Sequence, residues 1–391
     1  MKSSLQAALR ADWQNGGFGL YIHWPYCAAK CPYCDFNSHV SAQIDHSAWR
    51  EAYVREIARV GAETEGRVLN SVYFGGGTPS LMEPETVAAI LAEIGRYWPR
   101  ANDLEITLEA NPSSVEARRF AGYAEAGVNR VSLGIQSLRD GDLRALGRLH
   151  DVAQAKAALD VAKAHFGRVS FDLIYARQHQ QLEGWREELS EALDMAADHL
   201  SLYQLTIEPG TAFGDRYAIG RLGGLPDDDL GADMFELTQE MTKAAGFEAY
   251  EVSNHALNGS FSRHNLVYWR YGDYVGIGPG AHGRLTLAGR KYATVATSAP
   301  LAWLQLQAED SAEAREALTG SEQASEYLMM GLRIDEGVSL SRYAAMAGEP
   351  LDDQRIAQLT EDGLIWLEAG NIRATQRGRM VLNAVIRELM V

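Results

Sequence analysis

The sequence has 391 residues, of which 46% are hydrophobic and 23% charged, so it can bury a large core and has an ordinary globular composition. The net charge of −16 argues against a nucleic-acid-binding protein, whose footprint is a basic surface, and against an anionic membrane as the main partner. No apolar run is long enough to span a bilayer, and the first sixteen residues lack the apolar core of a secretory signal.

Short apolar runs alternate with longer amphipathic stretches in the first half of the chain, which predicts repeated βα units and a parallel sheet. Six such units are too few for the eight of a closed barrel, so we expect an α/β fold whose parallel sheet does not close into an eight-stranded barrel. Chemistry in such sheets sits at the carboxyl ends of the strands. The strands are expected at 19–23, 71–74, 105–109, 130–135, 169–174 and 200–205, and the helices at 48–63, 84–97, 115–126, 152–165 and 182–197.

The second half of the chain is less regular from residue 206 to 295, with one clear helical pattern at Asp228–Ala245. The last part predicts a small winged-helix-like domain. Because residues 301–391 hold 15 acidic against 8 basic residues, we interpret this domain as a cap or partner surface and not as a DNA reader. Its expected elements are helices at 322–332, 340–347, 352–362 and 376–389 and a hairpin at 364–373.

All three cysteines of the chain, Cys27, Cys31 and Cys34, follow the first predicted strand with the spacing C-x3-C-x2-C. The odd count and the crowding argue against disulfides, and clustered thiolates suit a soft metal centre. A structural zinc site normally takes four ligands, whereas three cysteines fit an iron–sulfur cluster with one iron left open. Buried cysteines that meet by chance are the remaining alternative. Free thiols need a reducing compartment, so we expect a cytoplasmic protein.

This cysteine spacing, with the aromatic Tyr33 just before the third cysteine, resembles the signature of the radical S-adenosylmethionine (SAM) superfamily. The wider phrase from residue 21 to residue 39 resembles the HemN/HemW branch, and within it the HemW heme chaperones. The resemblance implies an open (β/α)6 partial barrel of the radical SAM type. It also implies a 4Fe-4S cluster on the three cysteines, whose open iron is chelated by the amino and carboxylate groups of SAM. On this basis we divide the chain into an N-terminal segment (1–16), a radical SAM core ending in a heme-motif region (17–295) and a HemN-like C-terminal domain (300–391).

A glycine-rich stretch, Gly75-Gly-Gly-Thr-Pro79, follows the second predicted strand. Glycines allow close backbone approach, but no Gly-Lys-Ser/Thr follows, so the stretch is not a P-loop. From the residues alone it is equally well a plain turn, and any single strand-end charge is better explained as a solvated group. The resemblance implies that the stretch contacts the amino end of SAM, and that further strand-end residues complete the pocket. The SAM-binding residues so implied are Tyr21 (at the end of strand one), Tyr33, Gly76, Gly77, Thr78, Glu109, Gln136, Arg148 and Asp172.

A second phrase, His264-Asn-Leu-Val-Tyr268-Trp269, resembles the heme-binding motif of the HemW proteins. A histidine beside aromatic residues can be an axial heme ligand, and aromatic rings can pack on a porphyrin face. From the residues alone, a core histidine with satisfied partners is the alternative. The resemblance implies that His264 binds heme.

Two functions remain open at this point: a heme chaperone that passes heme to an acceptor protein, and an oxygen-independent coproporphyrinogen III oxidase that decarboxylates propionates by radical chemistry. The oxidase has a fourth cysteine where this chain has Phe36, and it has a long segment before its cluster loop where this chain has 26 residues. Together with the His264 phrase, these differences favour the chaperone, without coproporphyrinogen oxidase activity.

The expected partners are a heme-acceptor protein, with the membrane-associated respiratory chain as one candidate, and no nucleic acid. One stretch departs from the family. After Asp172-Leu-Ile-Tyr the family continues Gly-Leu-Pro-x-Gln, whereas this chain has Ala176-Arg-Gln-His-Gln180, so the shape of that loop stays open.

Overall fold

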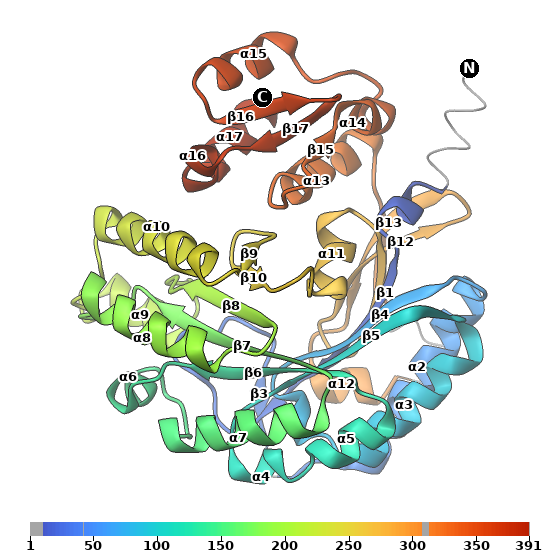
Figure 1. Cartoon of the computed structure of the whole chain (residues 1–391). Coiled ribbons are helices and arrows are strands. Elements are labelled where there is room, and N and C mark those ends of the chain that lie inside the picture. Colours follow the sequence, from blue (N-terminus) through green and yellow to red (C-terminus); the bar gives the residue numbers. More distant parts are fainter. Residues whose placement is uncertain (1–10, 42, 307–312, 391) are drawn as a thin grey trace.

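The computed structural model describes residues 11–41, 43–306 and 313–390. Its core is a curved twelve-stranded sheet with helices on its outer face (Figure 1). The six predicted parallel strands lie side by side in chain order, which confirms the α/β partial barrel. They are β1 (Phe18–Trp24), β4 (Leu69–Gly76), β5 (Arg100–Ala110), β6 (Arg130–Gln136), β7 (Arg168–Tyr175) and β8 (His199–Gln204).

The predicted helices cover the outer face of the sheet, and each buries an apolar side against it (Figure 1). The predicted helix at 115–126 is in fact two helices, and at the break the Arg119 guanidinium donates to the main-chain carbonyls of residues 80–82. A short helix, α6, was not predicted. The outer helices are α2 (His46–Thr64), α3 (Pro84–Tyr97), α4 (Ser114–Ala117), α5 (Phe120–Ala126), α6 (Asp140–Ala145), α7 (Val152–His165) and α8 (Leu182–Met195).

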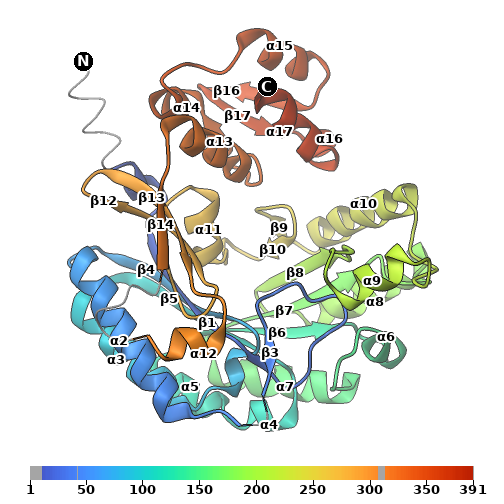
Figure 2. The same ribbon diagram turned by 180° about the vertical axis from the view of Figure 1, so that it is seen from behind.

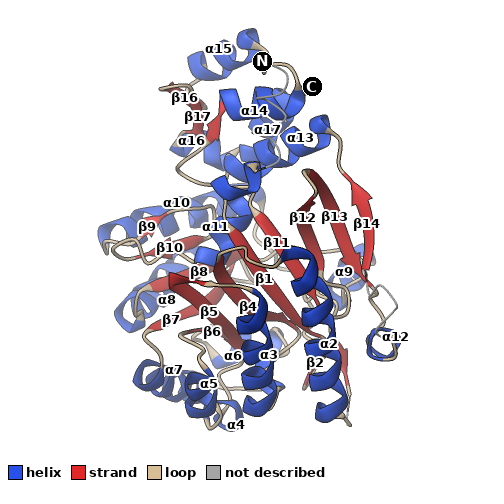
Figure 3. Ribbon diagram, turned by 90° about the vertical axis from the view of Figure 1, so that its right-hand side faces the viewer, coloured by secondary structure: helices blue, strands red, loops and turns tan. Residues whose placement is uncertain are grey.

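The region from 206 to 295 is more regular than its sequence suggests, because it extends the sheet at both edges (Figure 3). Beside β1, β11 (Asp273–Ile277) is parallel and β12 (His282–Leu287), β13 (Arg290–Ala296) and β14 (Glu313–Ala317) are antiparallel. Beyond β8 lie β10 (Asn254–Ala256) and β9 (Glu248–Ala249). The helices of this region are α9 (Ala212–Ala218), α10 (Asp228–Ala244) and α11 (Arg263–Trp269).

The C-terminal domain has its own apolar core and a three-stranded antiparallel sheet in the order β15-β17-β16, which agrees with the winged-helix prediction. It lies beyond α11, on the side away from the outer helices (Figures 1 and 2). Arg284 and Arg342 tie it to the core through ion pairs with Glu326 and Asp12. Its elements are α13 (Gly320–Gly331), β15 (Val338–Ser339), α14 (Leu340–Ala347), α15 (Asp353–Glu361), β16 (Ile365–Glu368), β17 (Asn371–Ala374), α16 (Gln376–Met380) and α17 (Leu382–Met390).

The first elements of the predicted C-terminal domain (300–391) pack with the core. Trp303 on α12 (Pro300–Leu304) stacks on Trp49 of α2 at a centroid distance of 5.6 Å, and β14 pairs with β13. Residues 1–10 of the predicted N-terminal segment lie outside the described residues, while its Asp12–Asn15 form a 3-10 turn. The boundaries at residues 16 and 300 stay predictions. No helix among the described residues is long and apolar enough to cross a membrane.

Candidate functional site

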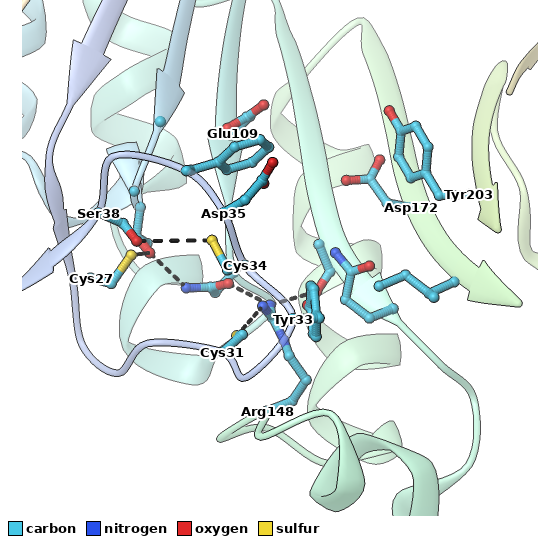
Figure 4. A pocket seen from close by; sticks show the side chains of 18 of the residues that line it. Cys27, Cys31, Tyr33, Cys34, Asp35, Ser38, Glu109, Arg148, Asp172 and Tyr203 are labelled. Carbon is cyan, nitrogen blue, oxygen red and sulfur yellow. Dashed lines mark hydrogen bonds between the residues drawn. The ribbon is translucent and has the colours of Figure 1, made fainter. Parts of the chain in front are cut away.

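A pocket of about 570 Å³ opens at the carboxyl ends of β4 to β8 and is covered by the loop that carries the cysteines (Figure 4). Its volume is in the range of sites that hold a small-molecule ligand. Most of the predicted cluster and SAM residues meet here, although they come from distant parts of the chain. Those that line the pocket are Cys27, Cys31, Tyr33, Cys34, Gly76, Gly77, Thr78, Glu109, Gln136, Arg148 and Asp172.

The cysteine loop is fixed at both ends. The short strands β2 (Tyr26–Cys27) and β3 (His39–Val40) pair in parallel, and Figure 2 shows the loop between them, in blue, crossing the strand ends. Asn37 anchors it further, because its side-chain nitrogen donates to the carbonyls of Pro279 and Ser298 at 2.9 Å. The His23 ring contacts the Asn37 carbonyl at 2.9 Å. The loop is therefore held against the end of β1 by contacts that do not involve the thiols.

The three thiols face the pocket and are partly buried. Burial raises the pKa of the Cys27 and Cys34 thiols, so their charged forms need a positive partner. Among the described residues, no three His, Cys, Asp or Glu side chains are arranged to hold a single metal ion. A cluster spreads its irons over separate corners and takes one thiolate at each. The three thiols of this loop fit three corners of an iron–sulfur cluster.

Each cysteine sulfur lies near a hydrogen-bond donor. Thr78 Oγ1 donates to Cys27 Sγ at 3.4 Å, and Arg148 Nη1 donates to Cys31 Sγ at 3.5 Å. The Ser38 hydroxyl lies 3.8 Å from Cys34 Sγ. Figure 4 shows the contacts of Cys31 and Cys34 as dashed lines. Such donors stabilise the negative charge of thiolates and of the sulfurs of a cluster.

The glycines after β4 serve packing more than ligand approach. A side chain at Gly76, whose φ is +111°, would lie 2.6 Å from the His23 ring, and one at Gly77 would lie 2.7 Å from the Tyr26 carbonyl oxygen. The Gly77 N–H is bonded to the Trp24 carbonyl at 2.7 Å. For Gly77 the structure shows that the backbone is joined to the end of β1, which brings Thr78 next to the cysteines.

Two carboxylates face the pocket, Glu109 from the end of β5 and Asp172 from within β7. Glu109 accepts from the Tyr73 hydroxyl at 2.7 Å, and Asp172 accepts from Ser132 at 3.2 Å. Burial raises the pKa of Glu109 to about 7, and the nearby Asp172 adds to the shift, while burial raises the pKa of Asp172 to about 6. A cationic ligand in the pocket would stabilise the ionised forms of both groups.

Gln136 and Arg148 complete the wall. Gln136 has a φ of +69° at a register shift between β6 and β7, a conformation that is rare outside glycine and is enriched at functional sites. Arg148 Nη2 donates to the Gly134 carbonyl at 2.8 Å and to Asn111 Oδ1 at 2.5 Å. Asn111 is a pocket residue that the sequence pattern did not indicate. Its only signal was an Asn-Pro pair directly after a strand.

Tyr21 does not line the pocket. It lies in the middle of β1 and not at the strand end, where we expected it, and its hydroxyl contacts His23 Nδ1 at 3.1 Å. Its ring is stacked with those of Tyr73 and His264, each at a centroid distance of 6.3 Å. Tyr21 therefore joins the aromatic core between the pocket and α11.

His264 lies on α11 in a closed environment and is 2% exposed. Its Nδ1 is hydrogen-bonded to Ser71 Oγ at 2.9 Å, and its Nε2 to the Tyr268 hydroxyl. The ring also stacks on Tyr73 at 4.8 Å, and burial lowers the pKa of His264 to about 3. Because both ring nitrogens have protein partners, neither is available to a heme iron in this conformation. Heme binding by His264 stays a prediction.

The divergent loop after β7 is held by buried charges. Ala176 and His179 have φ values of +56° and +61°, which is unusual for residues with a side chain. Arg177 is buried between two carboxylates, Asp142 at 2.7 Å and Glu188 at 2.5 Å. These ion pairs fix a loop that lacks the usual glycine.

Comparisons with known proteins place the chain in a family. The radical SAM superfamily profile matches residues 21–190, and the HemN C-terminal domain profile matches residues 318–381. Heme chaperone HemW of Escherichia coli (strain K12) is 39% identical over 379 residues, covering 94% of this chain and 96% of the relative. The mitochondrial radical S-adenosyl methionine domain-containing protein 1 of Bos taurus is 38% identical over 384 residues, covering 95% of this chain and 87% of the relative.

Among solved structures, coproporphyrinogen III oxidase (HemN) from Escherichia coli has the same fold. Its TM-score is 0.79 at 21% identity, and the match covers 100% of this chain and 93% of that one. The identity is too low to carry more than the fold. With the pocket described above and the HemW relatives, it leads to one assignment: the chain belongs to the radical SAM superfamily, in its HemN/HemW branch, and is a HemW-like member of that branch.

Proposed function

We propose that this protein is a heme chaperone, which binds heme and transfers it to an acceptor protein, and which carries a 4Fe-4S cluster and SAM in the pocket. The observation that carries the proposal is the set of groups that line the pocket. Three thiols face it, and the exposed, apolar Phe36 lines it at the position where the oxidase has a fourth cysteine. The curated relatives named as HemW support the same choice.

The residues of the pocket suit both cofactors. Cys27, Cys31 and Cys34 would each hold one iron, and the fourth iron would be left for SAM. Glu109 and Asp172 are placed for the ammonium, sulfonium or ribose of SAM, which gain from nearby carboxylates. When bound and reduced, the cluster supplies the electron that breaks a C–S bond of SAM, while the protein positions the reactants and excludes water.

Heme binding by His264 requires a conformational change. The ring would have to leave its hydrogen bonds to Ser71 and Tyr268, each worth about 1 kcal/mol. The seven-residue α11 lies between the sheet and α13 of the C-terminal domain, so opening it requires one of these neighbours to move. We propose that heme binds to this opened state of α11.

The experiment is a heme titration of wild type, His264→Ala, His255→Ala and His282→Ala, with iron content measured in parallel. His264→Ala should weaken heme binding and shift the heme absorbance, while the cluster stays intact. Of the two controls, His255 is fully buried and His282 is exposed, so together they separate burial from ligation. Equal affinity and spectra for wild type and His264→Ala would identify His264 as a core histidine.

Because His264→Ala also leaves two buried hydroxyl groups without partners, a second variant is needed. His264→Gln keeps polar atoms in the same space and should fold normally. If it too loses heme affinity at unchanged melting temperature, the loss reflects ligation and not folding. Normal heme binding by a well-folded His264→Gln would contradict the assignment.

The acceptor is proposed to be a cytoplasm-facing heme protein, and the membrane-associated respiratory chain is one candidate. Transfer can be followed by mixing the heme-loaded protein with an excess of an apo heme protein and recording the absorbance change. A stable chaperone-bound heme that never leaves would contradict a transfer function.

A further inference from the structure

Thr78 and Arg148, the two donors with the shorter distances to cysteine sulfurs, are joined by a third residue, Asn111. It follows β5 and lines the pocket. Its Oδ1 accepts from Arg148 Nη2 at 2.5 Å, and its Nδ2 donates to Thr78 Oγ1 at 3.2 Å. Thr78 and Arg148 in turn donate to Cys27 and Cys31. One continuous chain of hydrogen bonds therefore runs between two of the three cysteine sulfurs, with Asn111 at its centre.

The chemistry of these groups fixes the direction of each proton. An arginine side chain only donates, so the amide oxygen of Asn111 must face Arg148 and its nitrogen must face Thr78. The Thr78 oxygen then accepts from Asn111, and its single proton is left for Cys27 Sγ. Asn111 thus decides where the Thr78 hydroxyl points.

Asn111 is itself held from behind. Its main-chain N–H donates to Glu116 Oε2 at 2.9 Å, and the buried Glu116 carboxylate also accepts from Ser80 and Ser113. The following Pro112 favours an extended backbone at Asn111. The backbone that carries the amide is therefore fixed beside Thr78 and Arg148.

We propose that Asn111 is a positioning residue that raises the reduction potential of the cluster by aiming two donors at the cysteine sulfurs. This inference rests on the cluster of the proposed function. Reduction adds negative charge to a cluster, and donors at its sulfurs stabilise that charge. The bridge of Thr78, Asn111 and Arg148 therefore favours the reduced form, which supplies the electron that SAM takes.

The sharpest test is Asn111→Asp, which keeps the size of the side chain, removes its donor and adds a negative charge. The carboxylate accepts from both Arg148 and Thr78, so the Thr78 proton turns away from Cys27. In a redox titration of the reconstituted protein followed by electron paramagnetic resonance, the midpoint potential should move to a more negative value. Iron content and the visible spectrum should match wild type.

The added negative charge also lowers the potential, so the same substitution is repeated in a Thr78→Val background. There the charge effect remains and the hydroxyl effect is gone, so the shift should be smaller. Thr78→Ser, which keeps the hydroxyl, should stay near wild type. Asn111→Ala adds no charge and replaces Asn111→Asp as the test variant if the latter loses iron. The midpoint potential of the cluster in Asn111→Ala should also be more negative than in wild type.

Three results would decide against the proposal: equal potentials for wild type and Asn111→Asp, an equal shift with and without the Thr78 hydroxyl, or an unchanged potential in Asn111→Ala. The cluster of the proposed function would fail in a different way, because wild type would then hold no cluster at all after anaerobic reconstitution.

Discussion

The pocket at the strand ends and the surroundings of His264 differ in how their buried polar side chains are paired. In the pocket, thiols, carboxylates and Arg148 surround open space, and the pKa values of Glu109 and Asp172 are raised because burial disfavours their charged forms. Around His264 the polar atoms are matched within the protein, by Ser71 on one side and Tyr268 on the other. The comparison teaches that the cofactor site is preformed, whereas a heme site at His264 has to open.

The largest expected effect comes from the cysteines. Replacing Cys27, Cys31 or Cys34 by Ser should remove most of the iron and the brown absorbance after anaerobic reconstitution, because a cluster corner loses its thiolate. Heme titration of the same variants should resemble wild type, since His264 has no bond to the cysteine loop among those described.

Ser38→Ala is the matched control. It removes a hydroxyl 3.8 Å from Cys34 Sγ and no iron ligand, so it should keep its iron. Full iron retention in all three cysteine variants would remove the cluster from the pocket. Loss of heme together with iron would show that the two regions form one site.

The next effect in size concerns SAM. Gly76→Val should abolish the change that SAM causes in the electron paramagnetic resonance spectrum of the reduced cluster. The new side chain would meet the His23 ring at 2.6 Å and would need a φ of +111°, which costs about 1–3 kcal/mol and displaces Thr78. Gly184→Val, in open space on α8, is the control and should keep the response. A spectrum of wild type that saturating SAM leaves unchanged would mean that the cluster is only structural.

The two regions should also differ in the sign of their pH dependence. The pKa of Glu109 is raised from 4.5 to about 7, so the unfolded state loses this proton first and stability falls as pH rises from about 4.5 to 7. Glu109→Gln removes this term. At pH 8 and without SAM, denaturant titration should give this variant a free energy of unfolding higher than that of wild type by up to about 3 kcal/mol. The gain should vanish near pH 4.

His264 acts in the opposite direction. Burial lowers its pKa from 6.5 to about 3, so the unfolded state takes up a proton first and stability falls as pH drops from about 6.5 to 3. His264→Gln should flatten this acid limb in denaturant titrations. If both variants changed the pH dependence of stability with the same sign, the contrast between an open and a closed region would be wrong.

The smallest effect is expected far from both sites. The hairpin between β12 and β13 turns through Ala288 and Gly289, both with positive φ, the pattern that favours Asn-Gly. Ala288→Asn should raise the free energy of unfolding by about 0.5–1 kcal/mol, measured by denaturant titration. Cluster content and heme affinity should not change. A change in cluster content or heme affinity in this variant would show that these quantities follow the overall stability of the protein.

The sequence predicted what depends on local pattern. Apolar runs located the six parallel strands, and the resemblance to the radical SAM superfamily indicated that Glu109, Gln136 and Asp172 share one pocket. The cysteines lie within eight consecutive residues, so their loop could be read directly. These features need no knowledge of distant partners.

What the sequence could not predict depends on partners far along the chain. His264 bonds Ser71, which lies 193 positions away, and Arg148 reaches Asn111 across 37 positions. The added strands β11 to β14 carry no long apolar run, so the sequence pattern did not indicate them. They form by pairing with β1 and with one another. The loop at Ala176 is set by the ion pairs of Arg177 with Asp142 and Glu188.

The most direct test of the function is a paired assay on one reconstituted, anaerobic sample. It measures saturable heme binding by absorbance and the conversion of coproporphyrinogen III to protoporphyrinogen IX on the same protein. For a heme chaperone with Phe36 in its pocket, we expect heme binding with no conversion. Conversion at the rate of a true oxidase, without heme binding, would contradict the assignment.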